Sequence, residues 1–163
     1  MFYITSFDRN RNRILIPLAK KLDELKVKFD IFVVGKKTWK YKFKYLLSPA
    51  LNNISVKFRR KVIPNNIINQ HYQNSKAILD LMREGQYGLS FRIFEAMAME
   101  KKIVTNNPEI RNYNFYNPNN ILVLEEDFSN LNRDFFETPY EKLSKEIYDY
   151  YTLENWVDRV FDL

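Results

Sequence analysis

The sequence predicts an α/β protein, a Rossmann-like, doubly wound and mostly parallel six-stranded sheet flanked by helices. Two observations support this. Six short apolar runs alternate with segments whose apolar residues recur at helical spacing. The first 35 residues already follow the order strand, helix, strand, which joins two parallel strands by a right-handed crossover. At 163 residues and 45% hydrophobic content, the chain is expected to form one domain, residues 1–163.

The opening strand–helix–strand unit is the clearest part of the pattern. Residues 1–7 (MFYITSF) are apolar and β-rich, and residues 29–35 (FDIFVVG) are the nearly continuous apolar run of a strand buried on both faces. Between them, Asp8 or Asn10 is the expected N-cap of an amphipathic helix. Its apolar face carries Ile14, Leu15, Leu18, Leu22 and Leu25.

Four more strands complete the predicted sheet. They cover residues 53–58, 76–82, 101–106 and 119–125. A short helix is expected to begin near Pro64, and another is expected after Ser90, its predicted N-cap. Residues 36–50 are basic and aromatic, and they are interpreted as a surface helix or loop.

The end of the chain is predicted to be helical. Thr138-Pro139-Tyr140-Glu141 has the form of a capping box with proline at the first helical position. Thr152 is the expected cap of a last helix whose apolar residues form a full stripe. These C-terminal helices, over about residues 139–163, are expected to pack back on the sheet.

Composition narrows the classes of function. The absence of cysteine excludes disulfides and cysteine-based sites, and His71 is the only histidine, so no metal is expected. The net charge of +6 favours phosphate-bearing partners, with a merely solvated lysine-rich surface as the alternative. No nucleic-acid-binding motif is present, so nucleic acid is not expected. Neither a signal peptide nor a membrane-spanning run is predicted. The expected location is cytoplasmic, with or without peripheral contact at the inner face of the membrane.

Two loops are the candidate ligand sites, because ligands of such sheets bind beyond the carboxyl ends of the strands. The first loop runs from Ser6 to Asn12, and the second from Arg83 to Arg92. Near the first loop, Arg9, Arg11 and Arg13 are either surface charges or a phosphate clamp at a helix N-terminus.

The second loop carries the denser signal. Gly85 and Gly88 permit close approach of the backbone to a ligand. Arg92 falls in the first helical turn, where a cation is unfavourable unless an anion compensates it. Glu95 follows on the same helix face. One interpretation is an exposed Arg92–Glu95 ion pair. The other places both in a cleft, with Arg92 on phosphate and Glu95 accepting from sugar hydroxyls.

Residues 75–124 resemble the C-terminal, nucleotide-sugar-binding half of GT-B-type glycosyltransferases, in particular bacterial lipopolysaccharide and capsule biosynthesis proteins. The resemblance rests on Gln86 to Ala96 (QYGLSFRIFEA), Lys101 to Asn106 (KKIVTN) and Tyr113 to Ile121 (YNFYNPNNI). Where the broader family has a glutamate eight positions before the ribose-binding one, this chain has Tyr87.

The resemblance implies a hexosyltransferase-type enzyme whose donor is a nucleotide-diphosphate sugar. It implies that Glu95 binds the ribose, that Arg92 and Arg11 contact the diphosphate, and that Ser90 supports the loop. The remaining donor-binding residues would be Gln86, Gly88, Leu89 and Asn106. No catalytic residue is assigned, and no cofactor or metal is expected.

The resemblance also implies a missing partner. Such enzymes place the active site between two Rossmann-like halves, so an N-terminal acceptor-binding half or a partner chain would be needed for turnover. The alternative function is a non-catalytic interaction module. It would use the basic-aromatic stretch at residues 36–47 (KKTWKYKFKYLL) on an anionic membrane or a partner protein.

Overall fold

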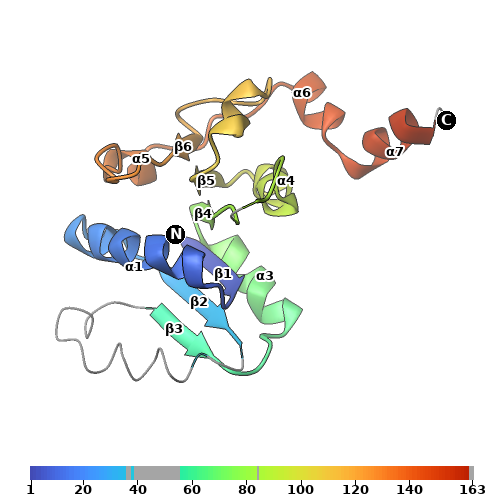
Figure 1. Ribbon diagram of the computed structural model, residues 1–163. Helices are drawn as coiled ribbons and strands as arrows, with labels where there is room; N and C mark the ends of the chain where they lie inside the picture. Colours follow the sequence, from blue (N-terminus) through green and yellow to red (C-terminus); the bar gives the residue numbers. More distant parts are fainter. Residues whose placement is uncertain (36–37, 39–55, 84, 162–163) are drawn as a thin grey trace.

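The computed structural model describes residues 1–35, 38, 56–83 and 85–161. In this part of the chain, six strands form one sheet in the order β3-β2-β1-β4-β5-β6. All five neighbouring pairs are parallel. The chain therefore winds outward from β1 in one direction and then from β4 in the other (Figure 1). This confirms the predicted fold class.

Apart from β3, whose predicted run begins outside the described residues, the strands are shorter than the apolar runs that predict them. Their bounds are β1 (Phe2–Ser6), β2 (Asp30–Val34), β3 (Val56–Arg59), β4 (Ala77–Asp80), β5 (Lys102–Thr105) and β6 (Ile121–Val123). All four residues of β4 and all four of β5 are buried, as expected for central strands covered on both faces.

Helices cover both faces of the sheet. They are α1 (Arg9–Glu24), α3 (Asn65–Asn74), α4 (Phe91–Ala98), α5 (Asp134–Glu137), α6 (Lys145–Tyr150) and α7 (Leu153–Phe161), with a 3-10 helix η2 (Pro108–Asn112). On one face α1 and α5 pack against Tyr3 and Val104, and on the other α3, α4 and η2 pack against Phe2 and Ile103. Successive residues of a strand therefore pack into two opposite cores. The first core lies between the sheet and α1 and α5, and the second core lies between the sheet and α3, α4 and η2. The short η2 and α5 had no clear sequence signal.

The predicted helix start at Pro139 is wrong. Helix α6 begins only at Lys145, where the Oγ of Ser144 accepts from the amide of Ile147 at 3.3 Å. Glu141 is engaged elsewhere. Its carboxylate accepts from the side-chain amides of Asn117 (2.7 Å) and Asn119. Its backbone exchanges hydrogen bonds of 2.7 and 2.9 Å with the side chain of Asn120. These contacts hold the segment as an irregular strap against the start of β6, so the local capping signal is overridden.

The prediction that the C-terminal helices pack back holds for only part of them. Ile147 and Tyr151 contact the second core. Helix α7 has the predicted apolar stripe, but Leu153 and Phe161 remain 75% and 64% exposed. It extends away from the sheet (Figure 1). Its predicted cap is confirmed, because Thr152 Oγ1 accepts from the amide of Asn155 at 3.4 Å.

The interpretation of residues 36–50 as a surface helix or loop lies outside the described residues, apart from Thr38. In the segments that are described, no helix has the length and apolarity needed to cross a bilayer.

Candidate functional site

The two predicted ligand loops meet at the carboxyl edge of the sheet. Strands β1 and β4 are neighbours although they are far apart in sequence, so the loops that follow them lie side by side. Arg83 Nη2, in the second loop, donates to Ser6 Oγ in the first at 3.0 Å. Arg92 Nη2, in α4, donates to the carbonyl of Ile4 in β1 at 3.0 Å. This edge is where the strand order reverses, the usual ligand position in such sheets.

A cavity of about 310 Å³ opens between these loops. Its lining comes from α1, α3, β4, the loop after β4 and α4, and comprises Arg11, Tyr72, Asp80, Leu81, Gln86, Ser90, Phe91, Arg92 and Glu95. A neighbouring cavity of about 520 Å³ extends toward β2 and the segment after β3. Arg11 and Arg92 line both, so the two cavities share a cationic wall.

Asp80 organises the interior of the site. Its Oδ1 accepts from Arg92 Nη1 and from Ser90 Oγ, each at 2.8 Å. Ser90 occupies the predicted N-cap position of α4, but its hydroxyl donates to Asp80 and makes no cap hydrogen bond. The end of β4 and the start of α4 are therefore joined through one buried carboxylate.

The compensating anion for Arg92 is thus Asp80, and the Arg92–Glu95 ion pair, one of the two interpretations of the sequence, is not formed. Burial by itself would lower the pKa of the Arg92 guanidinium. The Asp80 carboxylate, together with Tyr72 and Tyr3, outweighs that effect and raises the pKa above its ordinary value. Arg92 remains a cation in the cavity wall, and its guanidinium lies 5.3 Å from the ring centre of Tyr3.

Glu95 lines the cavity one helical turn beyond Arg92. Its side chain is exposed and has no hydrogen-bond or ion-pair partner among the described residues. A carboxylate in this state can accept two hydrogen bonds from neighbouring hydroxyl groups. Phe91, also in the lining, is 85% exposed and adds an apolar surface at the rim.

Arg11 is the only one of the three clustered arginines that reaches the cavity. Its Nη1 donates to Thr5 Oγ1 at 2.6 Å, while its Nε is buried without a partner, as is the Nε of Arg92. Arg9 and Arg13 are exposed and line neither cavity. Of the three arginines, only Arg11 is placed where the phosphate-clamp interpretation requires, while Arg9 and Arg13 fit the surface-charge interpretation. At the same helix end, the Asp8 carboxylate already accepts from the backbone N–H of Arg11 at 2.9 Å.

The other predicted residues fall into two groups. Gln86 lines the cavity, and its Oε1 accepts from the amide of Arg83 at 3.3 Å. Gly88, Leu89 and Asn106 shape the loop from outside the lining. Gly88 has a φ of 73°, Leu89 packs on the second core, and Asn106 Oδ1 accepts from the amide of Met82 at 2.7 Å.

Sequence reasoning missed three residues that build the site. Asp80 could have been identified from the sequence, because an acid inside an apolar run that forms a buried strand is a candidate site residue. Tyr72 reaches the cavity from α3. Asn107 is buried at the end of β5, and its Nδ2 donates to the carbonyl of Gly88 at 3.0 Å. The local sequence pattern does not identify Tyr72 or Asn107 as site residues, because both contribute to the site from segments that are distant in the sequence.

Fold and site together define a Rossmann-like domain with a polar, arginine-walled cavity at its switch point. No protein-family model matches the chain, and no curated protein matches it. A solved structure does match, the C-terminal domain of a glycosyl transferase group 1 family protein (LpcC) from Francisella tularensis. The TM-score is 0.53 at 16% identity, over 99% of this chain and 75% of that one. At this identity the likeness shows that the two share a fold.

Proposed function

We propose that the chain is the donor-binding domain of a glycosyltransferase and binds a nucleotide-diphosphate sugar. One observation carries the proposal. Two arginines and an unpaired carboxylate, Arg11, Arg92 and Glu95, line one cavity at the switch point of the sheet. A nucleotide diphosphate presents the complementary groups, an anionic diphosphate and a ribose diol.

The diphosphate is assigned to the arginine wall. Arg11 is the better direct ligand, because among the described residues only its Nη1 is engaged by another side chain. Arg92 has both terminal nitrogens committed, to Asp80 and to Ile4, so it contributes its charge. Glu95 accepts from the ribose hydroxyls.

The fold shared with a glycosyl transferase C-terminal domain supports the assignment as a glycosyltransferase domain. The proposed acceptor, a lipopolysaccharide or capsular glycan, follows from the resemblance to lipopolysaccharide and capsule biosynthesis proteins. The proposed domain transfers sugar only when an acceptor-binding half, in another segment or chain, completes the site. Arginine rather than a metal ion would stabilise the leaving diphosphate. The alternative, an interaction module acting through residues 36–47, rests on the basic-aromatic sequence of a stretch that lies, apart from Thr38, outside the described residues.

A thermal-shift screen tests the proposal. Uridine and guanosine diphosphates and their sugar derivatives are added to the purified chain. A ligand at 100 times its Kd should stabilise the fold by about 2.7 kcal/mol, which raises Tm by several degrees. Arg11→Gln and Glu95→Gln should remove most of the shift.

Two matched variants serve as controls. Arg13→Gln removes the same charge from α1 at a residue outside the cavity, and Glu154→Gln removes an exposed carboxylate from α7. Both should retain the full shift. If no nucleotide or nucleotide sugar changes Tm of the parent chain, the proposed function is wrong.

A further inference from the structure

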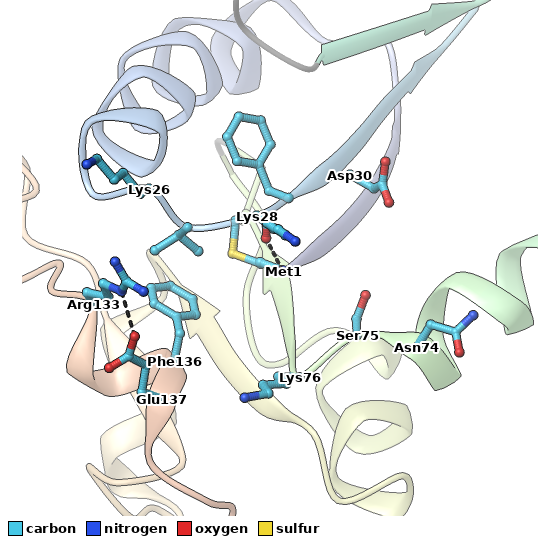
Figure 2. A pocket seen from close by; sticks show the side chains of 12 residues that line it. Met1, Lys26, Lys28, Asp30, Asn74, Ser75, Lys76, Arg133, Phe136 and Glu137 are labelled. Atoms are coloured by element: carbon cyan, nitrogen blue, oxygen red, sulfur yellow. Dashed lines mark hydrogen bonds and ion pairs between the residues drawn. The ribbon is translucent and has the colours of Figure 1, made fainter.

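A third cavity lies at the opposite, amino edge of the sheet. It has a volume of about 390 Å³. Four segments line it, which are Met1 before β1, the turn between α1 and β2, the turn between α3 and β4, and helix α5 with the preceding Arg133. Figure 2 shows the side chains of α5 on one side, Ser75 on the other, and Met1 with Lys28 facing Lys76 across the opening. The proposed donor site uses none of these residues.

The inner wall of this cavity is apolar. Met1 and Phe136 are buried there, and Val27 and Phe29 are half-buried members of the first core. A ligand with an apolar group could therefore remove hydrocarbon surface from water at this wall.

The rim is cationic, because both of its acids already have partners. Glu137 accepts from Arg133 Nε at 2.6 Å, and Asp30 is paired with Lys57 and lies 3.5 Å from His71. Lys28 and Lys76 have no side-chain partner among the described residues. Two ammonium charges on this rim are thus left uncompensated.

Two further donors stand beside these lysines. Arg133 donates to Glu137 through Nε, and this bond orients the guanidinium. Its two terminal nitrogens have no hydrogen-bond partner among the described residues. The hydroxyl of Ser75 makes no hydrogen bond within the described part of the chain. In Figure 2 the side chains of Lys26 and Asn74 point away from the opening, so neither is counted among the groups that would contact a ligand.

We propose that this amino-edge cavity binds a phosphate ester whose organic group is apolar. Phosphate has three strong acceptor oxygens and a charge near −2, which match two ammonium groups, a guanidinium and a hydroxyl. A carboxylate carries a single negative charge and two acceptor oxygens, so it matches this set of donors less well. The apolar wall of Met1, Val27 and Phe136 receives the organic group. The ester is either a free small molecule or the headgroup of an anionic lipid, since both present the same chemistry.

Titration followed by backbone amide NMR tests the site directly. Phenyl phosphate should shift the amides of Ser75, Lys76 and Phe136. It should bind more tightly than inorganic phosphate, because the phenyl ring contacts the apolar wall. In Lys28→Gln/Lys76→Gln its Kd should rise about tenfold, from the loss of two charge contacts in a solvated rim. Arg133→Gln should also raise the Kd for phenyl phosphate.

A matched double variant controls for net charge. Lys142→Gln/Lys145→Gln removes two exposed lysines that do not line this cavity, and it should keep the parent Kd within about twofold. Sedimentation with phosphatidylcholine vesicles, with and without phosphatidic acid, separates the sources. Binding to the anionic vesicles that Lys28→Gln/Lys76→Gln abolishes indicates a lipid headgroup. Phenyl phosphate binding without vesicle binding indicates a free ester.

The proposal is overturned if phenyl phosphate binds equally well to the parent chain and to Lys28→Gln/Lys76→Gln. It is also overturned if the shifted amides cluster around Arg11 and Arg92, at the other edge of the sheet.

Discussion

The Arg92 guanidinium and the Asp80 carboxylate form a nearly buried ion pair, with Nη1 and Oδ1 2.8 Å apart. The pair joins the first turn of α4 to the end of β4, and Ser90 donates to the same oxygen. A cation at a helix N-terminus opposes the helix dipole. Here the cation is retained because an acid on the adjacent strand compensates it. The ion pair also fixes how the loop between Asp80 and Arg92 enters the helix.

Replacing Asp80 should therefore destabilise the fold. In Asp80→Ala the Arg92 charge stays buried without its partner, and we expect the free energy of unfolding to fall by about 3–5 kcal/mol. Asp80→Asn, which keeps an acceptor for Arg92 and Ser90, should cost less. Urea unfolding monitored by circular dichroism measures both. Asp23→Ala, an exposed acid of α1, is the control and should change stability by less than about 0.5 kcal/mol. Unchanged stability of Asp80→Ala would contradict the assigned pairing.

Lys102 is a buried lysine that attaches α5 to β5. Its ammonium donates to the carbonyl of Phe135 at 2.8 Å and to Thr138 Oγ1 at 2.5 Å, and lies 4.7 Å from the ring centre of Phe135. Lys102→Met keeps most of the volume but removes both of these hydrogen bonds. We expect a loss of about 1–3 kcal/mol in urea unfolding at neutral pH.

The cost of Lys102→Met should depend on pH. Burial lowers the pKa of the Lys102 ammonium below its ordinary value of 10.5. Between the lowered folded pKa and 10.5, the unfolded chain binds more protons than the folded one, so the contribution of Lys102 to stability increases as pH rises. The stability difference between parent and variant should therefore grow toward alkaline pH. A difference that shrinks as pH rises would show that Lys102 is not held as described.

Glu141 should hold the strap between α5 and α6. In Glu141→Ala the side chains of Asn117 and Asn119 lose their acceptor, and we expect stability to fall by about 1 kcal/mol. Residues 138–144 should also become more sensitive to limited proteolysis, read out by mass spectrometry. Glu146→Ala, an exposed acid of α6, is the control. Were Glu141 a helix capping residue instead, its loss would affect α6 helicity and leave proteolysis of the strap unchanged.

The sequence predicted the elements of the sheet because periodicity is a local property. Continuous apolar runs such as residues 29–35 appear only where both faces of a strand are covered, and β2 is found there. The loop before α4 was predicted as a ligand loop on the same kind of evidence, which is glycine, a strand end and a helix start. Cavities at the carboxyl edge are consistent with that expectation.

The tertiary structure determined which charged and polar side chains pair with each other. Arg92 could pair with Glu95 by spacing alone, yet burial beside β4 makes Asp80 the partner and leaves Glu95 open to the cavity. Likewise, the capping box at Thr138 is a valid local signal, but no helix begins there. Glu141 instead forms hydrogen bonds with the asparagines before β6. Sequence alone indicated all six strands, most of the helices and the two loops that lie at the carboxyl edge of the sheet. The pairing of charges required the fold, because burial makes an uncompensated charge far more costly than any local preference.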